Sequence, residues 1–243
     1  GALARERETF GEDVSEAFER DGFLVLEGFA SEEEVRAMRH RAGELIDQFD
    51  PETVNVFSTK KQQQTLDAEA QRRYFADSAS GTGFFFEENA FAEDGTLRRS
   101  KRESINKIGH ALHDVDPTFR PFSRGDKVKA LLSRLGYRVP VPVQSMYIFK
   151  QPRIGGEVVP HQDNTFLWTD PKPSCVGLWL ALEDATTQNG CLWGWKGSHK
   201  LGCERRMLQG EGGQIVFDPE QPAEHDAKNF EALEVKAGTL VVL

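Results

Sequence analysis

The chain has 243 residues, of which 38% are hydrophobic and 28% charged, an ordinary composition for one globular domain. Its 39 acidic and 30 basic residues give a formal net charge of −9, so we expect neither nucleic acid nor a membrane as a partner. Three cysteines without C-x-x-C spacing argue against a disulfide framework and favour a reducing, cytoplasmic compartment.

The first part of the chain is predicted to begin with helices. Apolar residues recur at helical spacing over residues 10–18, and a short apolar strand is expected over 23–26. Ser31 and Glu34 have the spacing of a capping box, in which each side chain binds the other residue's backbone N–H. This pattern predicts a helix that starts after Ser31 and ends before Pro51.

Further helices and one strand are expected before residue 139, where short strands become the main predicted element. The charged region around 62–64 is predicted to be helical and solvated, and the phenylalanines at 84–86 are predicted to form a short buried strand. Residues 102–113 and 126–135 are both predicted to be helical. Residues 1–138 are therefore expected to be mainly helical.

From residue 139 onward, short strands separated by turns are predicted. Gly155-Gly156 and Asn189-Gly190 are examples of the turn signals. The expected strands cover 141–150, 157–162, 176–183, 191–195, 214–217, 233–235 and 239–243. Many short strands at this spacing are typical of a sandwich or jelly roll. Helices followed by strands give an α+β plan, with helices bracing one sheet of a β core.

His161 and Asp163 are the residues with the clearest chemical meaning. On a strand, residues two positions apart point to the same face, so both side chains could reach one metal ion. An imidazole and a carboxylate suit Fe(II), and a third ligand would complete a facial triad with open positions for substrate and oxygen. An H-x-D pair is also common in surface loops, so the pair alone leaves both interpretations open.

Seven segments together form a pattern that is more specific than the H-x-D pair. They are DGFLVL at 21–26, SINKIGH at 104–110, QSMYIFKQP at 144–152, PHQD at 160–163, GLWLALEDAT at 177–186, NGCLW at 189–193 and GSH at 197–199. In this order they resemble the phytanoyl-CoA dioxygenase family of Fe(II)- and 2-oxoglutarate-dependent oxygenases. The resemblance runs from about residue 16 to the last residue.

The resemblance implies a fold and a site. The fold would be a double-stranded β-helix, a cupin-like jelly roll with N-terminal helices packed outside, in a single oxygenase domain over 1–243 whose core is 139–243. The site residues would have two roles. The catalytic metal ligands would be His161 and Asp163, and the residues lining the 2-oxoglutarate pocket would be Lys107, Met146 and Trp179.

The residues themselves agree with these roles without requiring them. A dicarboxylate needs a cation, which Lys107 can supply as a point charge. Trp179 would help to keep an iron centre dry, and Met146 fills irregular apolar space. Without the resemblance, Lys107 could be a solvated helical residue, and the core would be the favoured place for Trp179 and Met146.

The reaction implied by the resemblance couples oxidative decarboxylation of 2-oxoglutarate, which yields succinate and CO₂, to hydroxylation of a small molecule. It would use Fe(II), 2-oxoglutarate and O₂, with ascorbate as a further candidate. Acyl-CoA hydroxylation is the family's best-known reaction, but the sequence does not identify the substrate. Lys150 and Arg153 precede the metal motif, where they could meet an anionic substrate or be ordinary surface charges.

Two elements of the family pattern are expected beyond Leu243. The third iron ligand would be a histidine reached shortly after 239–243, and the arginine that anchors 2-oxoglutarate would lie further on. The core within 1–243 is therefore expected to lack its last strands. Two alternatives stay open: a non-catalytic binding protein of the same fold with an incomplete metal site, and a cupin-like metalloprotein with another reaction.

Four other histidines have local contexts that argue against metal ligation. His225 lies in a polar loop and is expected at the surface, and His199 belongs to an element that resembles a structural loop. His110 and His113 would share one helical face, where packing or a substrate pocket explains them better than ligation. The sequence leaves the oligomeric state open.

Overall fold

The computed structural model describes residues 13–51, 68–210 and 214–243. These residues form two compact units. The first unit combines the residues up to Ser31 with Val158–Leu243, and the second is Glu32–Glu157. The expectation of a single domain over 1–243 stays a prediction.

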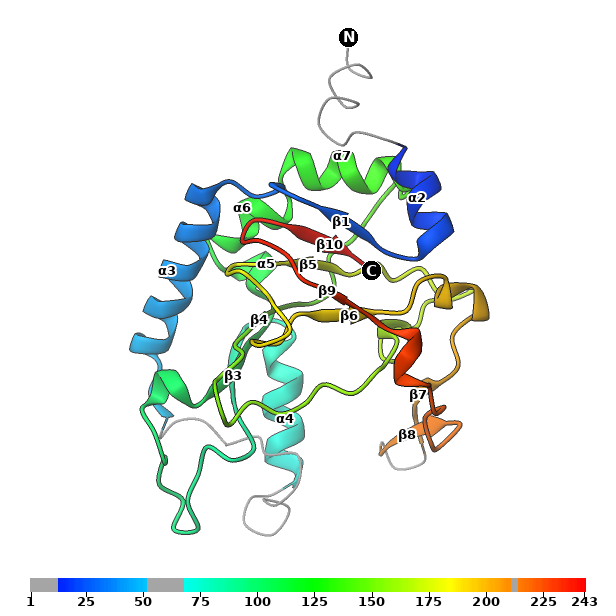
Figure 1. The fold of residues 1–243 in the computed structure, drawn as a ribbon. Coiled ribbons are helices and arrows are strands. Elements are labelled where there is room, and N and C mark those ends of the chain that lie inside the picture. The colour runs from blue at the N-terminus through cyan, green and yellow to red at the C-terminus, as the bar shows by residue number, and fades with distance from the viewer. Residues whose placement is uncertain (1–12, 52–67, 211–213) are drawn as a thin grey trace. The chain divides into compact units, whose positions relative to one another are not determined.

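The first unit is organised around a three-stranded antiparallel sheet in the order β1 (Leu24–Leu26), β10 (Leu240–Val242), β5 (Leu178–Leu180) (Figure 1). The central strand β10 is fully buried, because its three residues are at most 1% exposed. The sheet therefore joins segments that lie far apart in the sequence, and it supplies apolar core residues of this unit.

Two antiparallel ribbons and one helix complete the first unit. One ribbon pairs β6 (Leu192–Gly194) with β9 (Glu231–Leu233), and the other pairs β7 (Arg206–Gln209) with β8 (Ile215–Asp218). The helix α2 (Val14–Asp21) starts where the Asp13 carboxylate accepts a hydrogen bond from the Ser15 N–H, and it ends at Gly22, whose φ of 85° is left-handed.

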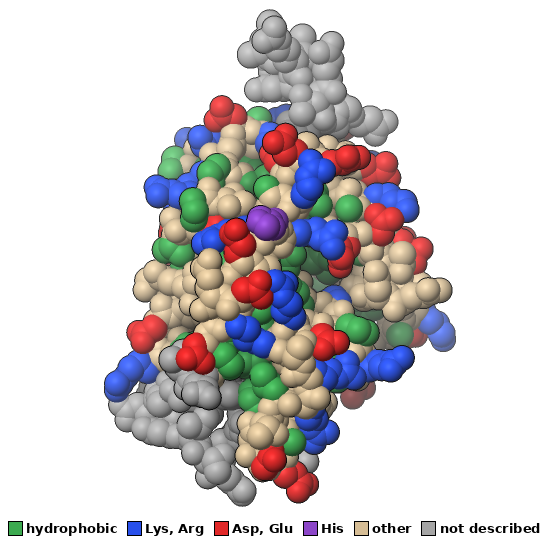
Figure 2. Space-filling view, turned by 90° about the vertical axis from the view of Figure 1, so that its left-hand side faces the viewer, with side chains coloured by type: hydrophobic (Ala, Val, Ile, Leu, Met, Phe, Trp, Pro, Cys, Tyr) green, Lys and Arg blue, Asp and Glu red, His purple; other side chains and the backbone are tan. Residues whose placement is uncertain are grey.

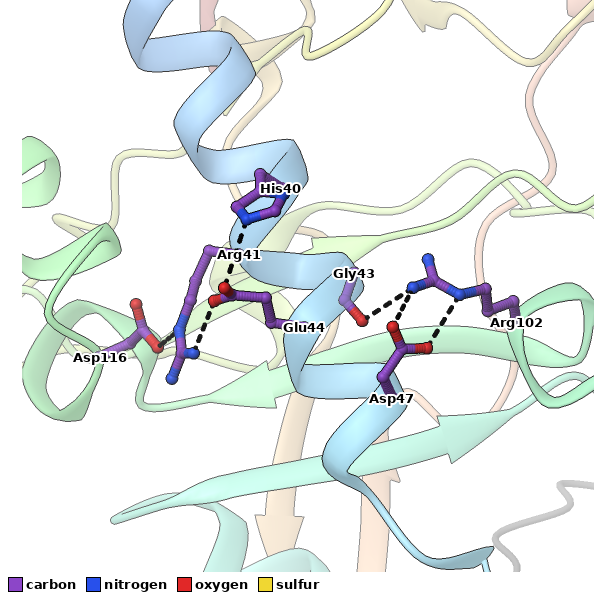
Figure 3. Close-up of polar contacts among 7 residues, drawn as sticks. All are labelled: His40, Arg41, Gly43, Glu44, Asp47, Arg102 and Asp116. Carbon is purple, nitrogen blue, oxygen red and sulfur yellow. Dashed lines mark hydrogen bonds and ion pairs between the residues drawn. The ribbon is translucent and has the colours of Figure 1, made fainter.

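The second unit contains the long helix α3 (Glu32–Gln48), which begins directly after Ser31 as predicted. Its buried side chains, Val35, Met38, Ala42 and Ile46, recur at helical spacing. Polar contacts fix its other side (Figure 3). Arg41 binds the buried carboxylate of Asp116 at 2.8 Å.

The sheet of the second unit has the order β2 (Thr82–Phe86), β3 (Ile105–His110), β4 (Ser145–Ile148), all antiparallel. Strand β2 is buried as predicted, and the ring of Phe84 stacks on Phe49 with centroids 4.2 Å apart. The remaining helices of the unit are α4 (Ala68–Ser78), η3 (Lys101–Glu103), α5 (Leu112–Val115), α6 (Phe119–Ser123) and α7 (Asp126–Arg134).

The predicted helix over 102–113 is wrong. This segment forms η3, the strand β3 and the start of α5. Ile105 and Ile108 are completely buried in the sheet, so tertiary packing decides the structure of a stretch whose apolar spacing also fits a helix. Lys107 and His110 are therefore strand residues, and His113 lies on a separate short helix.

The predicted strand over 157–162 is also wrong, because these residues have irregular backbone. Two glycines precede the segment and Pro160 interrupts it, and proline cannot donate a ladder hydrogen bond. The other expected strands exist but are mostly shorter than predicted, β7 was not predicted, and the region 62–64 lies outside the described residues.

The α+β plan is confirmed as a mixture of helices and antiparallel sheets. Before residue 139, β1 and β2 match the two expected strands, whereas β3 was not predicted. The described strands form separate small sheets and ribbons. The jelly roll therefore stays a prediction.

No described helix has both the length and the apolar character needed to cross a membrane. Figure 2 shows one face of the molecule, on which acidic and basic side chains are intermixed without a broad field of either charge. The expectation that neither a membrane nor nucleic acid is a partner stays a prediction.

Candidate functional site

The side chains of His161 and Asp163 converge although their backbone is not a strand. Nε2 of His161 lies 3.3 Å from Oδ1 of Asp163. Both side chains are accessible, with exposed fractions of 42% and 48%. The convergence arises because the irregular chain turns into a single helical turn, η4 (Asp163–Thr165), which begins at Asp163 itself.

A backbone hydrogen bond sets the orientation of the His161 ring. Nδ1 of His161 donates to the carbonyl oxygen of Val159 at 2.9 Å, which leaves Nε2 as the nitrogen that carries the lone pair in the neutral ring. This partner is of the kind that fixes metal-ligating histidines. Two acceptor atoms then face each other and need a proton or a cation between them. The hydrogen bond that the protonated His161 ring donates to Asp163 accordingly raises the pKa of His161, against the opposing effect of burial.

The position of Asp163 depends on a close approach to Gly177. A Cβ atom at residue 177 would lie 3.2 Å from Oδ2 of Asp163, closer than most side-chain contacts. Gly177 exchanges both backbone hydrogen bonds with Leu243, which extends the pairing of β5 and β10 by one step. A glycine at this point therefore makes room for the carboxylate beside the sheet.

Gln162, between the two candidate ligands, anchors the motif to a later loop. Its amide nitrogen donates to the carbonyl of Gly202 at 2.8 Å, and its amide oxygen accepts from the N–H of Glu204 at 2.9 Å. Local sequence patterns do not predict this role. Its only signal was the place of Gln162 inside the PHQD segment.

Trp179 belongs to the same unit as His161 and Asp163. It is half-buried on β5 and pairs in register with Val241. Because residues two apart on a strand share a face, Trp179 lies on the face on which Gly177 approaches Asp163. Asp163 therefore lies beside the face of this strand that carries Trp179, and His161 lies 3.3 Å from Asp163.

Lys107 and Met146 lie in the second unit, on one face of its sheet. Lys107 and Gly109 are two apart on β3, and Gly109 pairs with Met146 of β4. Met146 is 42% exposed, so it is not a core residue. Nζ of Lys107 lies 5.6 Å from the ring centroid of Phe85.

Burial lowers the pKa of Lys107, and the carboxylate of Glu87 partly opposes this effect. Lys107 is therefore neither a helical nor a solvated residue, which corrects that alternative. Glu87 is itself only 3% exposed, and its Oε2 accepts from the Gly156 N–H. Among the described residues, Oε1 has no hydrogen-bond partner. A partly desolvated ammonium suits electrostatic attraction of an anion.

The donor set of His161 and Asp163 fits a divalent iron ion, as an oriented imidazole nitrogen and a carboxylate oxygen within reach of one position. Within the described residues, no cluster of three or more His, Cys, Asp or Glu side chains is arranged to hold a metal ion. His161 and Asp163 would thus supply two of the ligands.

His199 has a structural contact. Its Nε2 donates to the carbonyl of Glu19, near the C-terminal end of α2. Two neighbours bind the same helix end, since the Gly197 N–H donates to the Asp21 carbonyl and Lys200 Nζ donates to the Arg20 carbonyl. The GSH segment therefore caps α2.

His225 pairs with Glu204 at 3.0 Å, and its ring meets that of Trp195. Its side chain is 22% exposed, so it is less accessible than a surface histidine. The loop that carries it is thus held by side-chain contacts.

His110 and His113 do not share a helical face, which corrects that prediction. Each is 3% exposed and binds a serine, with Nδ1 at 2.8 Å from Ser78 Oγ for His110 and from Ser145 Oγ for His113. Burial, and then the charge of Lys107, lower the pKa of His110 to about 4. His110 is therefore a neutral packing residue, which agrees with the first of the two roles expected for it.

Comparisons with known proteins identify the family. The family model described as phytanoyl-CoA dioxygenase (PhyH) matches residues 18–243. A phytanoyl-CoA dioxygenase of Arabidopsis thaliana is 52% identical over 231 residues, covering 95% of this chain and 79% of the relative. Phytanoyl-CoA dioxygenase 1 of rice, Oryza sativa subsp. japonica, is 57% identical over 226 residues, covering 93% and 77%.

More distant comparisons agree. Phytanoyl-CoA dioxygenase domain-containing protein 1 of Rattus norvegicus is 46% identical over 231 residues, covering 93% of this chain and 79% of the relative. The crystal structure of AviO1 from Streptomyces viridochromogenes Tue57 superposes with a TM-score of 0.57 at 19% identity, covering 96% and 84%. This likeness supports the fold alone. The chain therefore belongs to the phytanoyl-CoA dioxygenase family, as its sequence motifs predict.

Proposed function

We propose that this protein is an Fe(II)- and 2-oxoglutarate-dependent dioxygenase. It would convert 2-oxoglutarate and O₂ to succinate and CO₂ while hydroxylating a small molecule. The observation that carries the proposal is the convergence of His161 Nε2 and Asp163 Oδ1, with the other ring nitrogen fixed by Val159. Membership in a family of dioxygenases supports the reaction class.

The residues have distinct roles in this proposal. His161 and Asp163 hold iron, which supplies oxidative chemistry when bound. Lys107 attracts the dicarboxylate, and its half-buried position strengthens that attraction. Trp179 and Met146 provide apolar walls that limit water. These roles belong to a cupin-like jelly roll that forms one oxygenase domain.

Relatives named phytanoyl-CoA dioxygenase make an acyl-CoA-like molecule one candidate substrate. The three cysteines are free thiols, which fits a reducing, cytoplasmic compartment. Ascorbate is a candidate accessory reductant. The partner we expect is therefore a small molecule.

The test is Fe(II)-dependent formation of succinate from 2-oxoglutarate in air by the full-length protein. His161→Ala should abolish it, because the oriented nitrogen ligand is lost. His40→Ala is the matched control, since His40 is an exposed residue of α3 whose side chain is paired with Glu44, and it should leave turnover unchanged. Absence of succinate in all three proteins would overturn the proposal, and binding of 2-oxoglutarate without turnover would instead identify a non-catalytic binding protein.

A further inference from the structure

A pocket of about 440 Å³ in the second unit is rich in arginine. Its lining residues are Asn89, Ala90, Arg98, Arg99, Arg153 and Ile154. The lining includes three cations and no acidic side chain. A pocket of this size can hold a small ligand. It contains none of the residues assigned to the proposed iron and 2-oxoglutarate sites.

The two consecutive arginines are held by a small hairpin. Its strands are joined by the bridge between Phe91 and Leu97, and the Arg98 N–H donates to the Ala90 carbonyl at 2.9 Å. The Arg98 side chain donates through Nε to the Phe91 carbonyl at 2.9 Å. This bond orients the guanidinium. Within residues 13–51, 68–210 and 214–243 its terminal N–H groups have no partner, which leaves them for a ligand.

The third arginine comes from a loop that is anchored at both ends. Before it, the Gln151 amide donates to the Ile105 carbonyl at 3.1 Å, and after it the Gly156 N–H donates to the Glu87 carboxylate at 3.2 Å. Arg99 connects the hairpin directly to this loop, because its Nη1 donates to the Pro152 carbonyl at 3.1 Å. The cationic walls are therefore positioned before any ligand arrives.

Arg153 itself has two unusual features. Its φ of 72° is left-handed, and it is the only described residue other than glycine with a positive φ. Within the described part of the chain its guanidinium makes no hydrogen bond or ion pair, so its donors are available. Arg153 thus combines a strained backbone with a cationic side chain that has no partner among the described residues. At a pocket wall, this combination indicates a ligand-binding role.

We infer that Arg98, Arg99 and Arg153 form a binding pocket for a phosphate dianion. Three like charges around one hollow repel each other, and a bound anion relieves that repulsion. A phosphate group carries more charge than a carboxylate at neutral pH and offers more acceptor oxygens. The planar donor fork of arginine matches phosphate geometry in bidentate contacts. The volume of the pocket leaves room for the molecule that carries the phosphate.

The test is calorimetric titration of the full-length protein with inorganic phosphate, with AMP as a phosphate monoester, and with acetate as a monoanion. The phosphates should bind saturably and acetate should not. Tighter binding of AMP than of inorganic phosphate would assign the pocket to a phosphorylated molecule, and the reverse order would assign it to free phosphate. Saturable binding of neither phosphate would overturn the inference.

Three variants locate the binding. Arg98→Gln and Arg153→Gly should each weaken phosphate binding by about tenfold or more, because each removes charge-assisted hydrogen bonds. Glycine accepts the left-handed conformation at residue 153, so Arg153→Gly keeps the fold while it removes the cation. Arg36→Gln, on the exposed side of α3, is the matched loss of one charge and should bind as the parent does. Equal phosphate affinity in all four proteins would show that the pocket is not the site.

Discussion

Nε2 of His161 lies 3.3 Å from Oδ1 of Asp163, and the other ring nitrogen of His161 is bound to a backbone carbonyl. When the His161 ring is neutral, both facing atoms are hydrogen-bond acceptors. A proton or a metal cation is therefore needed between them. The raised pKa of His161 shows the attraction for the proton. A divalent cation would use the same two lone pairs, which makes this pair the expected centre of the chemistry.

Gly177→Ala should weaken metal binding without unfolding the protein. The added Cβ would lie 3.2 Å from Oδ2 of Asp163, so the half-exposed carboxylate must move away from its place beside His161. We expect Fe(II) affinity to fall by about tenfold, the loss typical of a disturbed ligand environment. Anaerobic titration with Fe(II) measures it. Gly156→Ala, where an added Cβ meets nothing within 4 Å, is the control, and an equal affinity in both variants would contradict the geometry.

Gly22→Ala should destabilise the fold far more than Gly28→Ala. Both glycines have a positive φ, at 85° and 64°, so both substitutions cost about 1 kcal/mol of backbone strain. At Gly22 the new Cβ would also lie 2.2 Å from Nδ1 of His199, which caps α2, whereas at Gly28 it meets nothing within 4 Å. We therefore expect roughly 3 kcal/mol for Gly22→Ala. Chemical denaturation measures the difference, and similar losses would be inconsistent with the capping contact.

Asp116→Ala should be strongly destabilising. Its carboxylate is 3% exposed, pairs with Arg41 at 2.8 Å, and accepts the backbone N–H groups of Thr118 and Phe119 at the start of α6. Removing it leaves Arg41 without its buried partner, which costs about 3 kcal/mol or more. Glu44→Ala removes the more exposed partner of the same arginine and should cost less than about 1 kcal/mol. Urea denaturation of the two variants tests the contrast, and a reversed order would refute it.

His110 should make the folded protein sensitive to acid. Its pKa is lowered from 6.5 to about 4 by burial and by Lys107, so below pH 6.5 the unfolded chain takes up the proton first. Stability should therefore fall as the pH decreases from about 6.5 toward 4, by up to about 3 kcal/mol from this residue.

His110→Gln isolates this contribution, because the other titrating groups are common to both proteins. Its free energy of unfolding should depend less on pH between 7 and about 4.5 than that of the parent. Denaturation curves at several pH values provide the comparison. Parallel pH profiles would show that His110 is not neutral in the folded state.

The spacing of His161 and Asp163 predicted that their side chains lie together, but not the way in which their backbone is built. The two side chains do lie together, although the expected strand is irregular chain ending in a helical turn. Gly177, which allows the close approach of Asp163, could not be found this way, because the contact joins segments far apart in the chain.

Local patterns predicted α3 and β2 well, because a capping signal and a run of phenylalanines define them. They failed at 102–113, where a buried strand has apolar residues at spacings that also suit a helix. Of the arginines in the pocket, the sequence pointed only to Arg153, as a residue that could meet an anion. Arg98 and Arg99 reach the pocket through a hairpin that the sequence pattern did not predict.

The most direct test of the metal site is anaerobic calorimetric titration of Fe(II) into the full-length protein, Asp163→Asn and Asp126→Asn. Asp163→Asn keeps the side-chain shape but removes the anionic ligand, whereas Asp126 is fully exposed at the start of α7. We predict one Fe(II) per chain in the parent and in Asp126→Asn, and an affinity at least about tenfold weaker in Asp163→Asn. Unchanged Fe(II) affinity in Asp163→Asn would contradict the assignment of His161 and Asp163 as the iron site.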